Sequence, residues 1–173
     1  MWEDPIVQPR PDIDSHDFRS ALGCFPSGVC LVTTMGPGDK PAGLTVNSFT
    51  SVSLDPPMVL WSLSRAASCA PVFRNAEYFA VNILAAGDEA LSIHFAKQVP
   101  DKFAAFAERF ASGLGGVPVL QGAAATFECH TRHRNYGGDH IILIGVVERY
   151  AHCERPPLVF HRGGYVAGKL PGR

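Results

Sequence analysis

Two short runs of small polar side chains are the residues of this sequence best suited to binding a ligand. The first spans residues 47–53 and holds five hydrogen-bonding side chains, and the second spans residues 62–68 and includes Arg65. A row of hydroxyls and backbone amides suits a flat polar ligand that needs donors along its edge and partners for a sugar-like chain. Arg65 and a second cation, Lys97, suit a phosphate group. Either run alone is also typical of an ordinary turn, but two runs separated by one core strand favour a phosphorylated ligand.

A glycine-rich segment, Gly137-Gly138-Asp139-His140, is the second candidate for binding. Two glycines let the backbone approach a ligand closely, and the Asp-His pair could orient a polar group there. The same residues are typical of a hairpin turn with an exposed histidine. From spacing alone, the turn is the favoured interpretation.

Metal and nucleophile chemistry finds little support in the sequence. It contains no Gly-x-Ser-x-Gly elbow, no Walker loop and no Gly-x-Gly-x-x-Gly motif that opens a helix. Alternation along a strand would place Glu128 with His130 on one face, and Cys129 with His133 on the other. Neighbouring arginines disfavour a divalent cation there and no third ligand is evident, so we expect no metal site.

The composition indicates one neutral globular domain. The chain has 173 residues, a formal net charge of −1, 46% hydrophobic residues and 18% charged residues. These values exclude disorder and leave no basic field to hold a nucleic acid. No apolar run is long enough to span a membrane, and the first residues lack the layout of a signal peptide. The five cysteines are widely spaced and odd in number, so we expect reduced thiols and a cytoplasmic location.

The predicted elements favour an antiparallel β fold with short helical insertions. Residues 1–13 predict a loose arm, and Asp14 or Ser15 is expected to cap a short helix that continues to about Phe25. Strands over 29–34 and 42–46 predict a hairpin, Ser68 is expected to cap a helix, and helical spacing returns over 88–95. Further strands are expected at 58–63, 79–84, 123–134 and 140–150, with a loop over 135–139, and 158–161 and 165–167 complete the sheet.

The same spacing arguments extend to the core and to the fold class. Phe103, Phe106 and Phe110 lie at helical spacing and are expected to be core residues. Because strands and helices do not alternate regularly, a doubly wound parallel fold is disfavoured and an antiparallel barrel is expected.

Several segments, taken in order, resemble the flavin reductase-like family, the short-chain NAD(P)H:flavin reductases of two-component monooxygenase systems. The resemblance extends from about Phe18 to Tyr165. Each segment is weak alone, but their combination and order are specific. The matching segments are FRxALxxFxxGV at 18–29, GLTVNSFTSVSLDPP at 43–57, FxVNIL at 79–84, HFA at 94–96, GDH at 138–140 and PLVFHxGGY at 157–165.

The resemblance implies a fold and a set of ligand contacts. The implied fold is a mainly β, six-stranded split β-barrel with a Greek-key layout, forming a single domain over residues 1–173 and usually a homodimer. By position, the flavin edge and ribityl chain match Thr45, Val46, Asn47 and Ser48. The ribityl and phosphate contacts match Ser51, Ser62, Leu63, Ser64, Arg65 and Ser68, and the phosphate end matches Phe95, Ala96 and Lys97. The region where nicotinamide approaches the flavin matches His140, His161, Gly163, Gly164 and Tyr165.

The implied activity explains the lack of a nucleophile. In this family a hydride passes directly from NADH or NADPH to FMN or FAD, so the protein has to align two rings and stabilise negative charge. His140 is then expected to position the nicotinamide rather than transfer a proton. The implied role is to supply reduced flavin to a partner monooxygenase. Two alternatives remain: a non-catalytic flavin-binding or electron-storage protein, and an FMN-retaining oxidase of the pyridoxamine-phosphate oxidase type, which the lack of a strongly basic cluster disfavours.

Overall fold

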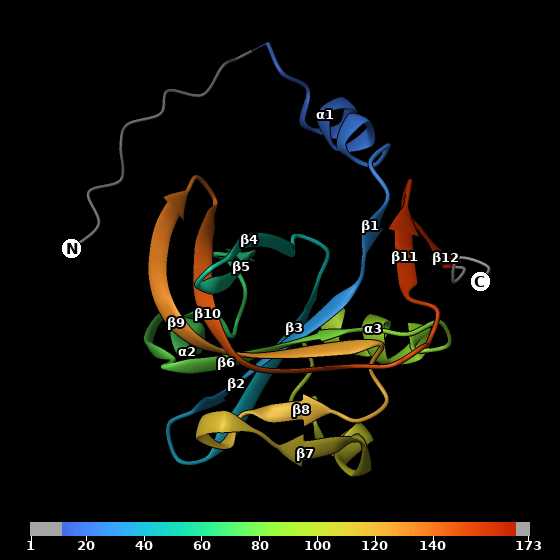
Figure 1. The fold of residues 1–173 in the computed structure, drawn as a ribbon. Helices are drawn as coiled ribbons and strands as arrows, with labels where there is room; N and C mark the ends of the chain where they lie inside the picture. The colour runs from blue at the N-terminus through green and yellow to red at the C-terminus, as the bar shows by residue number, and fades with distance from the viewer. Residues whose placement is uncertain (1–11, 169–173) are drawn as a thin grey trace.

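An antiparallel seven-stranded sheet forms the body of the protein (Figure 1). The structure is a computed structural model and describes residues 12–168. The strands lie in the order β3-β2-β6-β9-β10-β5-β4, and β3 approaches β5 from the far end of this order, so the sheet curls into a barrel. The strands are β2 (Cys30–Gly36), β3 (Lys40–Val46), β4 (Thr50–Leu54), β5 (Pro57–Ser64), β6 (Tyr78–Ile83), β9 (Ala125–Gly137) and β10 (His140–His152). The predicted fold class, mainly β and antiparallel, is confirmed.

A second, three-stranded sheet lies beside the barrel, in the order β1-β11-β12. The prediction that 158–161 and 165–167 complete the main sheet is therefore wrong. These two strands pair with each other, and β11 also pairs with the short strand β1, where Ser27 faces Phe160. The strands of this sheet are β1 (Ser27–Gly28), β11 (Leu158–His161) and β12 (Gly164–Ala167), and a separate pair is formed by β7 (Phe110–Ser112) and β8 (Pro118–Leu120).

The helices are short, and two of their predicted ends are wrong. Asp14 caps the first helix as predicted, because its Oδ1 accepts hydrogen bonds from the amides of His16 and Asp17 at 2.7 and 2.8 Å. That helix ends at Leu22, before Phe25, and the second helix starts after Cys69 with no side-chain cap, so Ser68 does not cap it. The predicted arm over 1–13 lies almost wholly outside the described residues. The helices are α1 (Ser15–Leu22), α2 (Ala70–Asn75) and α3 (Glu89–Ala96), with 3₁₀ turns η1 (Ala104–Arg109) and η2 (Leu114–Gly116).

The long hairpin of β9 and β10 differs from the prediction in two places. The predicted loop over 135–139 is mostly strand, because the ladder continues until Gly137 faces His140 and leaves a two-residue turn. A β-bulge leaves Arg132 unpaired between Thr131 and His133, which reverses the alternation of side chains along the strand. Cys129 is buried and His133 is exposed, so the predicted pair does not share a face.

Strand β2 separates two hydrophobic clusters, since its successive side chains point to opposite faces. Val32 packs with Trp61 in the cluster that the barrel strands enclose, and Leu31 packs with Phe95 in a second cluster beneath α3. The predicted core phenylalanines are confirmed, because Phe103, Phe106 and Phe110 all pack in this second cluster. Helix α3 is thus anchored against β2 and β3.

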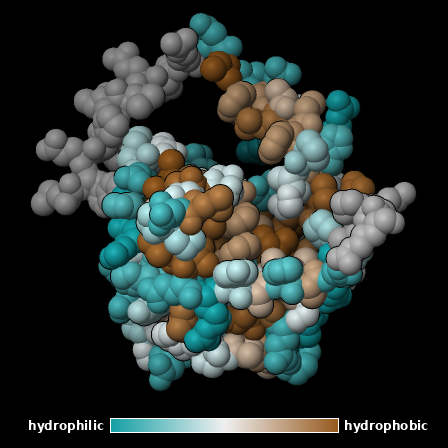
Figure 2. Space-filling model, viewed as in Figure 1, coloured by the Kyte–Doolittle hydropathy of each residue, from teal (hydrophilic) through white to brown (hydrophobic). Residues whose placement is uncertain are grey.

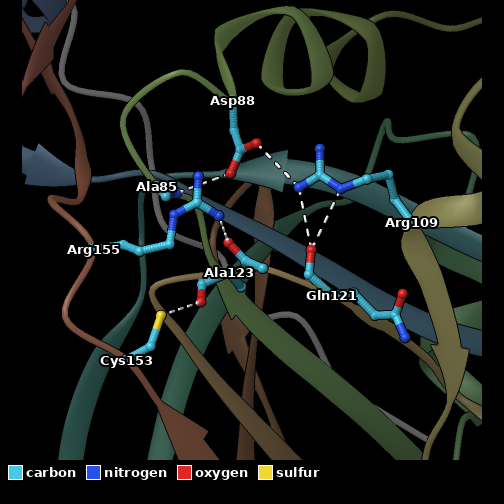
Figure 3. Close-up of polar contacts among 8 residues, drawn as sticks. Ala85, Asp88, Arg109, Gln121, Ala123, Cys153 and Arg155 are labelled. Carbon is cyan, nitrogen blue, oxygen red and sulfur yellow. Dashed lines mark hydrogen bonds and ion pairs between the residues drawn. The ribbon is translucent and has the colours of Figure 1, made fainter.

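A partly buried ion pair fixes the start of α3 (Figure 3). Asp88 Oδ1 lies 3.2 Å from Arg109 Nη2, and Asp88 Oδ2 accepts a hydrogen bond of 3.0 Å from the amide of Ala85. Arg109 also donates to the carbonyl of Gln121, and nearby Arg155 donates to the carbonyl of Gly122. The Asp88 carboxylate therefore links the start of α3 to Arg109, which in turn binds the segment at Gln121.

Replacing Asp88 with alanine is expected to lower the free energy of unfolding by about 2 kcal/mol, because the buried amide of Ala85 loses its acceptor and the Arg109 guanidinium keeps only the Gln121 carbonyl. Urea unfolding followed by circular dichroism measures the change. Glu89→Ala, at the exposed neighbouring residue, is the matched control and is expected to change stability by less than about 1 kcal/mol. Equal unfolding midpoints for the two variants would show that the ion pair does not contribute.

Candidate functional site

A pocket of about 200 Å³ lies where the end of β3 meets the β11–β12 hairpin. Strand β3 contributes Thr45 and Val46, and the chain continues into Asn47 at the mouth of the pocket. Phe160 and Tyr165, which face each other across the hairpin with ring centroids 5.4 Å apart, line the pocket together with Val29. Three of the predicted flavin residues and one predicted nicotinamide residue thus share one pocket.

Three hydroxyl groups hold the walls of this pocket together. Thr45 Oγ1 donates to the carbonyl of Ser92 at 2.7 Å, and Ser92 Oγ lies 2.9 Å from the Tyr165 hydroxyl. Ser92 is fully buried on α3 and was missed in the sequence. In the sequence, the only sign of this role is a single serine among the apolar residues of a helix. The contacts join β3, α3 and β12, so the orientation of the Tyr165 ring depends on all three.

The amides of residues 47–49 form a polar edge beside the pocket. These three residues connect the end of β3 to the start of β4. None of their amides donates a hydrogen bond to a backbone carbonyl of residues 12–168. Phe49 holds this segment in place, because its ring stacks on Phe127 with centroids 5.6 Å apart. Backbone amides without a partner are strong donors, so this edge is equipped to bind ring carbonyl or nitrogen acceptors.

Ser48 brings the two polar runs together. Its Oγ accepts a hydrogen bond of 3.0 Å from the amide of Ser62 and donates one of 3.1 Å to the Ser62 carbonyl. Alternation along β5 directs Trp61 and Leu63 into the core and Ser62 and Ser64 to the opposite face. Leu63 is fully buried, so only its backbone could contact a ligand.

Arg65 directly follows β5 and contacts the turn between β9 and β10. Its amide donates to the carbonyl of Asp139 at 2.9 Å, and its Nη1 lies 3.4 Å from the carbonyl of Gly138. Ser51 and Ser68, the remaining residues of the predicted ribityl and phosphate set, are exposed. The second polar run is therefore connected to the glycine-rich turn, which the sequence treated as a separate candidate.

The predicted phosphate end at α3 divides into a buried and an exposed part. Phe95 is fully buried, whereas Ala96 and Lys97 are exposed at the end of the helix. Lys102, which the sequence did not indicate, donates from Nζ to the carbonyl of Phe95 at 2.8 Å and lies 3.4 Å from that of Gly43. Burial lowers the pKa of Lys102.

The predicted nicotinamide residues fall into two separate groups. His140 starts β10 at the tip of the long hairpin, whereas His161, Gly163, Gly164 and Tyr165 belong to the β11–β12 hairpin, across the space beneath α1 in Figure 1. His140 Nδ1 donates to Asp139 Oδ1 at 2.7 Å. That hydrogen bond lowers the pKa of the Asp139 carboxyl. Within the described chain, His140 and Tyr165 therefore lie on different hairpins.

Residues 12–168 offer no metal cluster and no membrane-spanning helix. No group of three or more His, Cys, Asp or Glu side chains there is arranged to hold a metal ion. No helix of this part is long and apolar enough to cross a membrane. The five cysteines are free, and burial raises the pKa of Cys30 and Cys129 to about 12, so both thiols stay protonated at neutral pH.

The fold and the sequence are similar to those of known flavin reductases. FMN reductase (NADH) SmoA of Agrobacterium fabrum is 42% identical over 153 residues, which cover 88% of this chain and 85% of that protein. The Streptomyces globisporus NADH:FAD oxidoreductase SgcE6, solved in complex with NAD and FAD fragments, superposes with a TM-score of 0.83 at 36% identity and covers 88% of this chain and 92% of its own. The styrene monooxygenase flavin reductase of Pseudomonas putida S12 has a TM-score of 0.78 at 32% identity. The match covers 90% of this chain and 99% of that chain.

The family described as flavin reductase like domain matches residues 22–169, nearly the whole described chain. This match includes the pocket, both polar runs and the β11–β12 hairpin. Since the relatives share the fold over most of their length as well, the chain belongs to the flavin reductase-like domain family.

Proposed function

We propose that this protein is an NADH-dependent flavin reductase that supplies reduced FMN or FAD to a separate monooxygenase. The observation that carries the proposal is the polar edge of residues 47–49 beside the pocket lined by Thr45 and Tyr165. Two of the relatives support it by name, an NADH-dependent FMN reductase and the reductase of a styrene monooxygenase.

The residues present fit a flavin. The flavin supplies the redox chemistry when bound, since it accepts a hydride from the nicotinamide and carries it to the oxygenase. The amides of Asn47, Ser48 and Phe49 bind the polar edge of the ring and stabilise negative charge there, with no need for a titrating base. The pocket walls position the two rings, and the Ser92–Tyr165 contact holds one of those walls in place.

The phosphate of the flavin is bound at the exposed end of the site. Arg65 and Lys97 provide positive charge. Hydroxyls come from Ser51 on β4, from Ser62 and Ser64 on β5, and from Ser68 after it. Both cations are exposed to solvent, and charge pairing is weak where water screens it. A flavin held in this way exchanges readily, as a reduced flavin that passes to another enzyme requires.

The assignment of nicotinamide contacts gives a testable prediction for His140. His140→Ala is expected to raise the apparent KM for NADH several-fold and to leave the apparent KM for flavin unchanged, because the imidazole, which a second copy would bring to the open side of the site, positions the nicotinamide and does not transfer a proton. Steady-state NADH oxidation at saturating FMN measures it. The control is His152→Ala, at the exposed far end of the same strand. If His140→Ala left both KM for NADH and kcat unchanged, this role would be wrong.

A homodimer and a cytoplasmic location are part of the proposal. Helix α1 has no buried residue, and Figure 2 shows hydrophobic residues on α1 and on the surface of the barrel beneath it. Phe18, Leu22, Phe25 and Leu54 are exposed by 53, 59, 78 and 93%. Apolar side chains exposed to this extent are typical of an interface, and a second copy that covers them would also bring further residues to the open side of the site.

One assay tests the proposed function. We expect NADH oxidation that depends on added FMN or FAD, with flavin showing saturation kinetics as a substrate. Parallel reactions with NADPH show which nicotinamide donor is preferred. Reactions without flavin give the background rate. No turnover with either flavin would contradict the proposal. Yellow purified protein with slow NADH oxidation would support the alternative, a flavin-binding protein that stores electrons.

A further inference from the structure

A second pocket, of about 570 Å³, lies between α1 and the turn of the β11–β12 hairpin. Arg19 from the helix and Arg162 from the turn both line it, although 143 positions separate them in the sequence. His16, Asp17 and Gly163 line it as well. The resemblance to the family assigns no role to either arginine.

A backbone hydrogen bond connects the two walls of the pocket. The amide of Arg162 donates a hydrogen bond of 2.9 Å to the carbonyl of Gly23, directly after α1. Arg162 Nη2 also lies 3.7 Å from Cys24 Sγ, which directs the guanidinium along the same wall. The end of α1 and the hairpin turn are therefore held together, with both arginines at their junction.

Arg162 adopts a conformation that arginine rarely takes. Its φ is +47° and that of Gly163 is +82°, which form the two-residue hairpin turn in which Asn, Asp or Gly is favoured at the first position. Arginine carries a steric cost there. A guanidinium on such a tightly constrained turn points to a binding role for its side chain.

The charges of the pocket favour an anion. Within residues 12–168, neither Arg19 nor Arg162 forms an ion pair with a carboxylate. The carboxylate of Asp17 offsets one of the two positive charges, so an excess of one positive charge remains between these three side chains. Two guanidinium groups in one pocket suit a phosphate group, which each can bind through two parallel hydrogen bonds.

The position of the pocket identifies which phosphate it would hold. Phe160 and Tyr165 face each other in the first pocket, and the next residue pair along the hairpin is His161 and Gly164, followed by the turn with Arg162. Arg162 thus lies two residues beyond Phe160, roughly 7 Å along an extended strand. In a nicotinamide dinucleotide one ribose separates the ring from the diphosphate, whereas the 2′-phosphate of NADP lies a further nucleoside away.

We propose that Arg19 and Arg162 bind the diphosphate of the nicotinamide dinucleotide while its nicotinamide ring lies in the pocket lined by Tyr165. The inference rests on the proposed function, because it assumes that a nicotinamide dinucleotide is the hydride donor. It adds a specific binding site for that donor, formed by the helix and the turn, outside the residues that bind the flavin.

The test compares Arg19→Gln and Arg162→Asn with the wild-type protein. Asparagine favours the turn conformation at position 162, so this variant keeps the hairpin. Arg74→Gln, at an exposed arginine of α2, is the control with the same loss of charge. Calorimetry measures the Kd for ADP-ribose, for 2′-phospho-ADP-ribose and for inorganic pyrophosphate. Steady-state kinetics measures KM for NADH and for 1-benzyl-1,4-dihydronicotinamide, a hydride donor without phosphate.

We expect each arginine variant to raise the Kd for ADP-ribose and the KM for NADH about tenfold, with no change for the phosphate-free donor and no change in Arg74→Gln. An unchanged Kd for ADP-ribose in both arginine variants would overturn the proposal. A loss confined to 2′-phospho-ADP-ribose would overturn the assignment to the diphosphate. If the wild-type protein oxidises no dihydronicotinamide but binds ADP-ribose in a manner that needs both arginines, the proposed function fails and the diphosphate site stands.

Discussion

Asn47→Asp is expected to lower kcat/KM for flavin about tenfold in the NADH oxidation assay. The substitution keeps the shape of the side chain and places a negative charge at the mouth of the pocket, beside the amides that we assign to the flavin edge. At about 4 Å and an effective dielectric constant near 20, the aspartate and a full negative charge on the flavin edge would repel by about 4 kcal/mol. Asn47 is exposed, so water screens most of this energy, and about 1.4 kcal/mol remains, which corresponds to a factor of ten.

The control for this prediction is the same substitution at Asn75. That residue is exposed at the end of α2, and Asn75→Asp is expected to leave kcat/KM for flavin unchanged. The effect of Asn47→Asp should appear mainly in kcat, because the negative charge at the flavin edge develops as the hydride is transferred, and it should shrink at high salt. Wild-type kinetics in the Asn47 variant would place the flavin edge elsewhere than at residues 47–49.

Trp61→Ala is expected to lower the free energy of unfolding by about 3–5 kcal/mol, through lost burial and the cavity left behind. Trp61 is fully buried on β5, and its ring lies 5.0 Å from that of Phe73 and 6.0 Å from that of Phe79 in edge-on arrangements. Because the adjacent Ser62 faces the other side of the same strand and binds Ser48, loosening of β5 also disturbs the flavin site. Urea unfolding with flavin-binding titration measures both effects.

Trp61→Phe tests the effect of side-chain size while an aromatic ring is kept. The indole Nε1 of Trp61 has no hydrogen-bond partner among the described residues, so phenylalanine keeps the aromatic contacts and loses no polar interaction. We expect a loss well below that of alanine, about 1–2 kcal/mol. Equal losses for the two variants would mean that the size of the side chain does not determine stability at this position.

Local patterns were sufficient to predict most of the strands and the polar runs. Alternation and turn residues gave the β2–β3 hairpin, and the cap at Asp14 gave the start of α1, because each depends on residues a few positions apart. The family resemblance came from segments that remain in order along the chain. Errors arose where a neighbouring strand decides the conformation, as in the predicted loop over 135–139, which pairs across the hairpin, and in the bulge at Arg132.

The sequence by itself therefore determined the class of fold, the family and the polar segments around Asn47 and Ser62. Only the tertiary structure decided which side chains form the walls of the site. Ser92 meets Tyr165 from 73 positions away, and Arg162 meets the segment after α1 from 138 positions away. The physical reason is that these contacts depend on how the barrel strands, α3 and the β11–β12 hairpin pack, and no short sequence pattern records that packing.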